Sequence, residues 1–417
     1  MGESESITNM IKPISSVKTT NRRVIVRTGF DVPLKQNSHG ETEVADDTRI
    51  EKNLNTIRHL IEQKARIVII THLGRPEGWE MDKSLWPVAM RLAELLHYKI
   101  VRIKDRLPDY KVPHIYFLDS DITKKDYSEF SRQIRPGDIL FLENLRFYPG
   151  EKNDDDSFAE TLTQYGDIYV QGAFSNAHRK DASMNALALK LPHYGGLGFL
   201  KEIEALGKII RNPEKPLIVI MGGAKIDDKV ETLRNLGKNA SKIILGGAIA
   251  NTFLKALGYE IGKSKVSNVT VAKELLRSYR DKIFLPVDVV VAKDLESTPR
   301  LVKLEKIHPD ESIYDIGPET IKKIAEIIKT GKTLVWNGPF GVFEIPRYAF
   351  GSKAIAQAFA IQSKGKAFGV VGGGETVELI NQAKVGEFVD HLSTGGGAML
   401  EFLAGKELPA IKALESK

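Results

Sequence analysis

The chain has 417 residues, of which 42% are hydrophobic and 27% are charged, and its formal net charge at pH 7 is +6. A chain of this length exceeds one compact core, so we expect two domains of about 200 residues each. No apolar run is long enough to span a membrane, and the absence of cysteine excludes disulfides, thiolate metal sites and a cysteine nucleophile. The polar, acidic start is unlike a secretory signal, so a cytoplasmic protein is expected.

The first half of the chain alternates short apolar strands with amphipathic helices. Strands are predicted at residues 23–27, 67–70, 100–103, 115–118, 139–142 and 168–170. A first helix is predicted to begin after Asp46 and Asp47, with Ile50, Leu54 and Ile57 on its apolar face. This alternation is typical of a doubly wound parallel sheet, which we assign to an N-terminal domain over residues 1–194.

Residues 195–212 read as one amphipathic helix that ends at Pro213, and we expect it to act as an interdomain hinge. The alternation then restarts, with strands predicted at 217–221, 243–245, 283–285, 289–291, 334–336 and 368–371. The expected fold is therefore α/β, with two Rossmann-like doubly wound parallel-sheet domains joined by a hinge helix. The second domain covers 213–400. Residues 401–417 are too few for a domain and are expected to dock back across the hinge.

Basic side chains lie at or after the ends of several strands of the first half. They are Arg27, His72, Arg75, Arg146 and Arg179, joined by Asp31 and by Arg49 from the first helix. Ligands bind at the carboxyl ends of parallel strands, so these side chains are expected to lie close together. Guanidinium groups bind phosphate and carboxylate in bidentate fashion, and such a cluster suits a small polyanion that carries both groups. For any single arginine, a surface ion pair is the commoner explanation.

The second half has glycine-rich turns after its strands and little arginine. The turns are Gly222–Gly223, Gly246–Gly247, Gly372–Gly374 and Gly395–Gly397. Glycine lets the backbone approach a flat base or a phosphate chain, and Lys225 and Lys229 add positive charge beside the first turn. Any one of these turns is most often just turn geometry, but together they indicate a nucleotide. There is no Walker lysine motif, so the protein is not a P-loop enzyme.

Taken together, these motifs resemble the phosphoglycerate kinase family over the whole chain after its first ~20 residues. The matching stretches, in the family's order, are Arg27–Leu34, Asp46–Ile50, His72–Pro76, Glu143–Phe147, Ala177–Arg179, Gly222–Lys229, Trp336–Glu344, Gly372–Thr376 and Ser393–Ala398. The resemblance implies a phosphotransferase with a carboxyl group as acceptor. It would reversibly transfer phosphate from 1,3-bisphosphoglycerate to Mg-ADP, giving 3-phosphoglycerate and ATP in glycolysis and gluconeogenesis, with Mg²⁺ as cofactor.

The resemblance also implies roles for the residues that match the family's motifs. Catalytic roles would fall to Arg49, Lys225, Gly373 and Gly396. The triose phosphate would be bound by Gly29, Asp31, Arg49, His72, Leu73, Gly74, Arg75, Arg146 and Arg179. The nucleotide would be bound by Gly222, Lys225, Lys229, Gly247, Asn337, Glu344, Gly372, Gly373, Gly374, Glu375 and Thr376. Glu375 would lie nearest the metal ion.

The chain departs from the family's usual pattern at several of these positions. Gly29 and Asp31 stand where the family has aspartate and asparagine, Gln171–Gly172 replaces an Asn-Asp pair, and Glu375 replaces an aspartate. Because residues two apart on a strand share a face, we expect Asp31 to accept the substrate hydroxyl. These departures leave open a catalytically weakened homologue that acts as a ligand-binding protein.

A third reading is a nucleic-acid-binding module, which only the net positive charge suggests. The basic residues are scattered among acids, and neither a basic stripe nor an aromatic platform is present. We therefore expect no nucleic-acid partner and no membrane partner. With no long exposed apolar stripe in the sequence, a monomer is expected.

Overall fold

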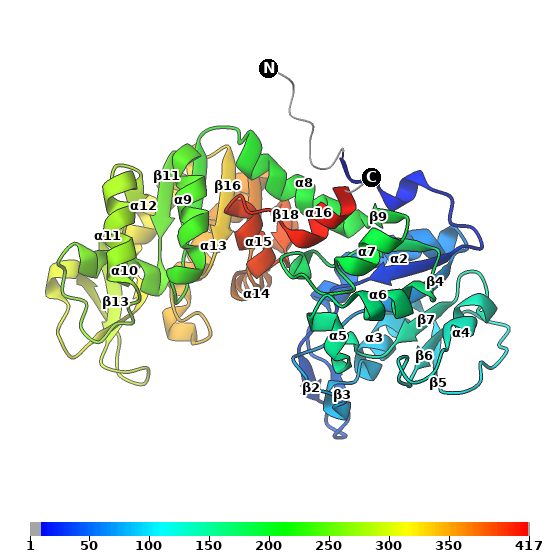
Figure 1. Ribbon diagram of the computed structural model, residues 1–417. Coiled ribbons are helices and arrows are strands. Elements are labelled where there is room, and N and C mark those ends of the chain that lie inside the picture. The colour runs from blue at the N-terminus through cyan, green and yellow to red at the C-terminus, as the bar shows by residue number, and fades with distance from the viewer. Residues whose placement is uncertain (1–9, 416–417) are drawn as a thin grey trace, which may run out of the picture. The chain divides into compact units, whose positions relative to one another are not determined.

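The computed structural model describes residues 10–415, and the chain divides into two compact units. The first unit takes the residues up to Glu204 and returns for the stretch from Glu407, whereas the second spans Ala205–Lys406 (Figure 1). The boundary between the units falls inside a helix, α8 (Leu197–Arg211), rather than in a loop. One continuous helix therefore runs from the first unit into the second.

The first unit is built on a seven-stranded sheet in the order β5-β6-β7-β4-β1-β8-β9. Its strands are β1 (Arg23–Arg27), β4 (Arg66–Ile70), β5 (Lys99–Ile103), β6 (His114–Leu118), β7 (Ile139–Leu142), β8 (Ile168–Gln171) and β9 (His193–Gly195). All neighbouring strands pair in parallel. The six strands predicted in this half are confirmed to within one residue at each end, and β9 is an additional edge strand.

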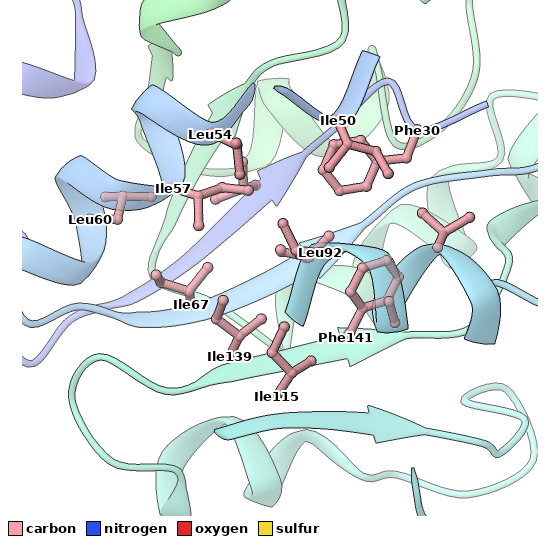
Figure 2. Packing of buried hydrophobic residues seen from close by; sticks show 14 of the residues in the cluster. Phe30, Ile50, Leu54, Ile57, Leu60, Ile67, Leu92, Ile115, Ile139 and Phe141 are labelled. Atoms are coloured by element: carbon pink, nitrogen blue, oxygen red, sulfur yellow. The ribbon is translucent and has the colours of Figure 1, made fainter. Parts of the chain in front are cut away.

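Helices cover this sheet. They are α2 (Thr48–Glu62), α3 (Trp86–Leu96), α4 (Ser128–Gln133), α5 (Pro149–Lys152), α6 (Asp156–Thr163) and α7 (Ala186–Lys190). The predicted start of α2 is confirmed, since the Asp46 carboxylate accepts a hydrogen bond from Thr48 N at 2.9 Å. Figure 2 shows the resulting core, which contains Ile50, Leu54, Ile57 and Leu60 of α2, Leu92 of α3, and Ile67, Ile115, Ile139 and Phe141 of the sheet. This core fixes the strands whose ends carry the polar residues.

The second unit is built on a six-stranded parallel sheet in the order β12-β11-β10-β16-β17-β18. Its strands are β10 (Leu217–Met221), β11 (Lys242–Leu245), β12 (Ile283–Phe284), β16 (Thr333–Asn337), β17 (Phe368–Gly372) and β18 (His391–Ser393). Its helices are α9 (Val230–Asn239), α10 (Gly247–Ala256), α11 (Val269–Tyr279), α12 (Pro318–Thr330), α13 (Phe350–Gly365), α14 (Gly374–Gln382) and α15 (Gly397–Leu403). The two predicted doubly wound parallel sheets are thus confirmed.

One strand predicted in the second half belongs to a different sheet. β13 (Asp288–Ala292) pairs antiparallel with β14 (Arg300–Lys303) and β15 (Ser312–Ile316) in a separate three-stranded sheet. A parallel crossover needs about a dozen residues, and too few separate β12 from β13 for one. The chain therefore leaves the main sheet after β12.

Shorter elements complete the two units. A two-stranded antiparallel hairpin, β2 (Leu34–Gln36) and β3 (Thr42–Val44), follows β1 and was not predicted. The 3₁₀ turns are η1 (Ile14–Ser16), η2 (Met81–Lys83), η3 (Leu145–Phe147), η4 (Phe174–Asn176), η5 (Asp227–Lys229), η6 (Leu304–Lys306), η7 (Pro346–Tyr348) and η8 (Gly386–Phe388). The last helix, α16 (Pro409–Glu415), belongs to the first unit, where Ala410 N donates to Ala177 O at 3.2 Å.

Candidate active site

In the first unit, polar side chains follow four strands that are neighbours in the sheet. Arg146 follows β7, His72 and Arg75 follow β4, Asp31 follows β1, and Arg179 follows β8. The strand ends are level, because the last residue of β1, Arg27, pairs with Ile70 of β4 and Gln171 of β8. Arg49 reaches the same edge from the first turn of α2. We call the side chains of Asp31, Arg49, His72, Arg75, Arg146 and Arg179 the arginine cluster.

Two arginines of the cluster are tied to backbone and two are free. Arg49 donates from Nη1 to the carbonyl oxygen of Asp31, and the nearly buried Arg146 donates from Nη1 to Gly74 O at 2.6 Å. The side chains of Arg75 and Arg179 make no hydrogen bond or ion pair with any other residue in the described part of the chain. Free guanidinium groups beside anchored ones are what an incoming polyanion requires.

His72 is fully buried at the base of the arginine cluster. Its Nδ1 lies 2.7 Å from Arg27 Nη2, and its Nε2 lies 3.8 Å from Asp31 Oδ2, too far for a hydrogen bond. Burial lowers the His72 pKa well below its ordinary value, and the nearby charges of Arg27, Arg179 and Arg49 lower it further. The imidazole is therefore neutral near pH 7.

Arg27, which the sequence analysis grouped with the other arginines, is enclosed in the protein interior and touches the cluster only at His72. Its side chain is 0% exposed, its Nε donates to Ser183 Oγ at 2.7 Å, and its Nη1 donates to the backbone oxygen of Thr28 at 2.5 Å. Glu151 lies beside it, with Oε1 at 3.8 Å from Nη2. Every side of this guanidinium is used inside the protein. Neither Ser183 nor Glu151 belongs to a motif that sequence reasoning singled out.

The structure shows how the unusual pair Gly29 and Asp31 is accommodated. A Cβ at Gly29 would lie 2.8 Å from Ser175 Oγ, so the serine hydroxyl fills the space of a larger residue 29. Asp31 is partly exposed, and its Oδ1 accepts a hydrogen bond from Gly74 N at 2.9 Å. The side chain of Leu73, which is predicted as a substrate contact, is buried in the apolar core. Only its backbone faces the loop, where Leu73 N donates to Asn144 Oδ1 at 3.2 Å.

In the second unit, glycine turns follow five neighbouring strands. They lie after β10 (222–223), β11 (246–247), β16 (338), β17 (373–374) and β18 (395–397). The strand ends are again level, because Met221 pairs with Leu245 and Asn337, and Gly372 pairs with Ser393. A cavity of about 500 Å³ opens here, and we call it the glycine cavity. Its lining includes Gly223, Gly247, Glu344 and Glu375.

Two of these turns require glycine because of their backbone conformation and the small space beside them. Gly373 has φ +94°, and a Cβ there would lie 2.8 Å from Asn337 Nδ2. Gly223 has φ +95°, and its Cβ would lie 3.0 Å from Lys229 Nζ. Side chains would be strained in this left-handed backbone and would fill the approach to the turns. Gly373 also forms the N-cap of α14, so free N–H groups and the helix dipole face the adjoining space.

Other predicted nucleotide residues tie the turns together. Asn337 Nδ2 donates to Gly372 O at 2.8 Å, and Thr376 Oγ1 accepts from Gly338 N at 2.6 Å. Gly372 itself is buried in β17, where Met399 fills the space beside it. Gly396 has φ +52° at the N-cap of α15 and does not line the glycine cavity. These residues shape the turns more directly than they reach into the cavity.

The two predicted lysines differ in environment. Lys229 is 9% exposed, and its Nζ donates to Gly222 O at 2.5 Å and Asn337 O at 3.4 Å. Burial lowers its pKa to about 8, against the opposing charge of Glu375. Lys225 is exposed, and within residues 10–415 its ammonium group has no hydrogen-bond or ion-pair partner. Lys225 is therefore free to meet a phosphate without breaking a contact.

No group of three or more His, Asp or Glu side chains in the described chain is arranged to hold a metal ion. Glu375, at the start of α14, offers one exposed hard oxygen ligand beside the cavity. Such a site fits Mg²⁺ that arrives with a nucleotide, because Mg²⁺ keeps most of its ligands from phosphates and water.

Sequence reasoning missed residues outside the main sheet that line the glycine cavity. Tyr314 and Asp315 come from β15, and Lys263 from the loop after α10. Asp315 is buried, accepts from Gly351 N at 2.8 Å, and has its pKa raised by burial to about 7. Their sequence signals were weak because they do not follow a strand of the main sheet.

Two further cavities lie in the first unit. One, of about 590 Å³, adjoins the arginine cluster through Asp31, Leu73 and Gly74. The larger, of about 880 Å³, lies between β3 and α3 and includes Trp86 and Arg91 in its lining. It contains no residue that the sequence analysis assigned to a site.

Comparisons with known proteins agree with this geometry. A family model described as "Phosphoglycerate kinase" matches residues 14–406. The phosphoglycerate kinases of Desulfosudis oleivorans and Dictyoglomus turgidum are 41% and 40% identical, over 97% and 95% of this chain and 99% and 96% of theirs. The solved phosphoglycerate kinase of Coxiella burnetii is 37% identical, with a TM-score of 0.81 over 97% of this chain and 98% of that one. The chain therefore belongs to the phosphoglycerate kinase family.

Proposed function

We propose that the protein is a catalytically active phosphoglycerate kinase. It reversibly transfers a phosphoryl group from 1,3-bisphosphoglycerate to Mg-ADP, with the carboxyl group of 3-phosphoglycerate as the acceptor in the reverse direction. The observation that carries this proposal is the pair of sites at the strand ends of two sheets. One is lined by cations and suits a small polyanion, and the other is lined by glycine turns and suits a nucleotide.

In this proposal the arginine cluster holds the triose phosphate. Arg75 and Arg179 supply free guanidinium groups for phosphate or carboxylate, and the anchored Arg146 fixes the position of one end of the ligand. The hydroxyl of the triose donates to Asp31, whose carboxylate is already oriented by Gly74 N. In this arrangement Gly29 makes no side-chain contact with the ligand, and only its small size matters.

The glycine cavity holds Mg-ADP or Mg-ATP in the same proposal. Glu344, exposed at the cavity, accepts hydrogen bonds from the ribose hydroxyls, and the turns at Gly222 and Gly373 approach the phosphates. Lys229 exchanges its two carbonyl partners for phosphate oxygens. Glu375 contributes one ligand to the Mg²⁺ that the nucleotide carries.

Phosphoryl transfer from an acyl phosphate needs alignment and charge, not a protein nucleophile. Arg49 of the first unit and Lys225 of the second are the proposed sources of positive charge for the transferring group. The substrates bind to separate units, so transfer requires the units to come together, and α8, which runs from one to the other, is the proposed hinge. Closing also excludes water, which would hydrolyse the donor.

The proposal gives the protein small-molecule partners only, acting as a monomer in the cytoplasm. No helix of the described residues combines the length and apolar character needed to cross a bilayer. The competing proposal is a homologue that binds both ligands without turnover, for which Gly29 and Glu375 are the motivating residues.

A coupled assay tests the proposal: ATP and 3-phosphoglycerate are supplied, and 1,3-bisphosphoglycerate is consumed by glyceraldehyde-3-phosphate dehydrogenase with NADH. We expect Mg²⁺-dependent oxidation of NADH that saturates with both substrates. Calorimetric titration of each ligand accompanies the assay. Binding of both ligands without turnover would favour the binding protein, and absence of binding would overturn both proposals.

A further inference from the structure

A line of four polar side chains that solvent does not reach runs beneath the arginine cluster and ends at its buried member, His72. Glu151, Ser183, Arg27 and His72 are each 0% exposed. They come from α5, the loop after β8, the end of β1 and the loop after β4. Buried charged groups are tolerated only when their hydrogen bonds are satisfied. The hydrogen bonds of this line therefore indicate which side chain it holds in place.

The line has a defined direction. Ser183 donates from Oγ to Glu151 Oε1 at 2.6 Å and from its backbone N to Oε2 at 3.0 Å. The same Oγ accepts from Arg27 Nε at 2.7 Å. Arg27 is thereby held on its Nε side by Ser183 and on its Nη1 side by Thr28 O at 2.5 Å. Its Nη2 is left to face His72 Nδ1 at 2.7 Å.

This contact determines where the proton of His72 lies. A guanidinium has only N–H donors and stays protonated in proteins, so His72 Nδ1 must accept from Arg27. An imidazole that accepts at Nδ1 and is neutral carries its proton on Nε2. The charged groups that act on the ring are Arg27, Arg179 and Arg49, which disfavour a second proton, and Asp31, the only nearby acid the structure shows at Nε2, at 3.8 Å.

His72 Nε2 is also a buried atom without a hydrogen-bond partner in the described structure. A buried donor without a partner is destabilising, and an oxygen of a bound ligand would satisfy it. Its neighbours are the side chains of the arginine cluster, the proposed position of the triose. The other tautomer would turn a lone pair toward the same anion and repel it.

We propose that Arg27 is a positioning residue that fixes His72 as the neutral Nε2–H tautomer, so that His72 donates one directed hydrogen bond to an oxygen of the triose phosphate. Ser183 and Glu151 hold Arg27 in the orientation that this requires. The identity of the ligand rests on the proposed function, whereas the tautomer follows from the contacts of Arg27 alone. The cluster thus combines undirected arginine charge with one donor of fixed direction.

The first test reads the tautomer directly. Long-range ¹H–¹⁵N NMR on protein labelled at histidine, with the His72 signal identified by its loss in His72→Gln, distinguishes the two nitrogens. We expect a protonated Nε2 and an unprotonated Nδ1 from pH 6 to pH 8. A protonated Nδ1, in the neutral or the charged ring, would overturn the proposal. This measurement needs no turnover, so an inactive protein would refute the proposed function and leave the tautomer decided.

The second test replaces the branched guanidinium group of Arg27 by a single ammonium group and so keeps the positive charge. In Arg27→Lys one ammonium cannot replace all three contacts, and we expect mixed tautomers of His72. The KM for 3-phosphoglycerate should rise about tenfold or more, as for loss of a hydrogen bond to a charged group, with the KM for ATP unchanged. An unchanged tautomer and triose KM in this variant would contradict the proposal.

The same strand supplies a matched control. Arg23, at the other end of β1, donates to Asp167 at 2.5 Å and to Ser131 at 3.3 Å, a similar arrangement without a histidine. Arg23→Lys should leave the His72 signal and both KM values unchanged. Ser183→Ala, with Ser131→Ala as its control, gives the same comparison if Arg27→Lys fails to fold.

Discussion

The two proposed anion sites lie at the same place in their sheets, at the carboxyl ends of the strands, but they are built from different groups. The first unit presents side-chain charges, and beneath them Glu151 and Ser183 hold the buried Arg27, which contacts His72. The second unit presents backbone, shaped by left-handed glycines such as Gly223 and Gly373, with one buried cation, Lys229. Recognition by side chains therefore needs a supporting polar network, whereas recognition by backbone needs space and unusual dihedral angles.

Each unit also contains a buried titratable group, and the two groups make the free energy of unfolding depend on pH in opposite directions. Burial raises the Glu151 pKa from its ordinary 4.5 to about 7, so between these values the folded protein binds a proton that the unfolded chain releases. Stability from this group is present below pH 4.5 and is lost as the pH rises toward 7. Lys229 behaves oppositely: its pKa falls from 10.5 to about 8, and its stabilisation is present above pH 10.5 and lost as the pH falls toward 8.

The largest effect should come from Arg49→Ala, which removes the proposed catalytic charge of the first unit. We expect kcat to fall by ~10³-fold with little change in ADP affinity, as for loss of charge that stabilises a transition state. Steady-state kinetics and ADP titration measure the two quantities. Arg58→Ala is the matched control, because Arg58 lies on the same helix and its side chain donates, within residues 10–415, only to Leu95 O at 3.3 Å. A loss of less than tenfold would remove Arg49 from the catalytic role.

Lys229→Met should weaken the second unit's site while stabilising its fold. We expect ADP affinity to fall roughly 100-fold, as for loss of a buried charged contact to phosphate. The difference between pKa 10.5 and about 8 corresponds to at most about 3 kcal/mol of stabilisation at pH 7 when the buried charge is removed. Urea unfolding of ligand-free protein should show this gain at pH 7 and a smaller gain at pH 10.

Lys238→Met, at the exposed end of α9, is the control for that measurement. It should change neither ADP affinity nor stability beyond a few tenths of a kcal/mol, as for most surface substitutions. Lower stability of Lys229→Met at pH 7 would show that the carbonyl contacts of the ammonium outweigh its burial.

A pair of variants sharpens the division between the units. Arg75→Ala should raise the KM for 3-phosphoglycerate about tenfold and leave the KM for ATP unchanged, whereas Glu344→Ala should do the reverse. Both residues are exposed, so neither change is expected to alter the fold. Kinetics with each substrate varied in turn would reveal the split, and equal effects of either variant on both KM values would refute it.

The smallest effect is expected where the chain departs from its family. Gly29→Asp should change 3-phosphoglycerate affinity by less than about threefold, since Asp31 is the proposed acceptor of the hydroxyl and a second acceptor adds little. Ser175 Oγ, 2.8 Å from the new Cβ, must also move, so Gly29→Asp/Ser175→Gly is measured beside it. A tenfold gain in either variant, by calorimetry, would show that Asp31 compensates only in part.

The parallel sheets could be predicted from the sequence because short apolar runs that alternate with helices have few other structural interpretations. Arg27 shows where prediction from sequence fails. Its position at the end of a strand predicted a ligand contact, yet its side chain bonds to groups in the protein interior. That orientation depends on Ser183 and Glu151, which lie more than a hundred residues away in sequence and belong to no motif. Likewise, no local sequence pattern indicated that β13 lies outside the main sheet or that Tyr314 and Asp315 line the glycine cavity.

The return of the chain to the first unit at its very end has a consequence for biosynthesis. Helix α16 packs into that unit, and Ala410 N bonds to Ala177 O, two residues before Arg179. A ribosome must therefore release nearly all of the polypeptide before its earliest-made half is complete, whereas the later-made half contains all its own segments. A chain that ended after Lys406 would contain every segment of the second unit and would lack α16 of the first.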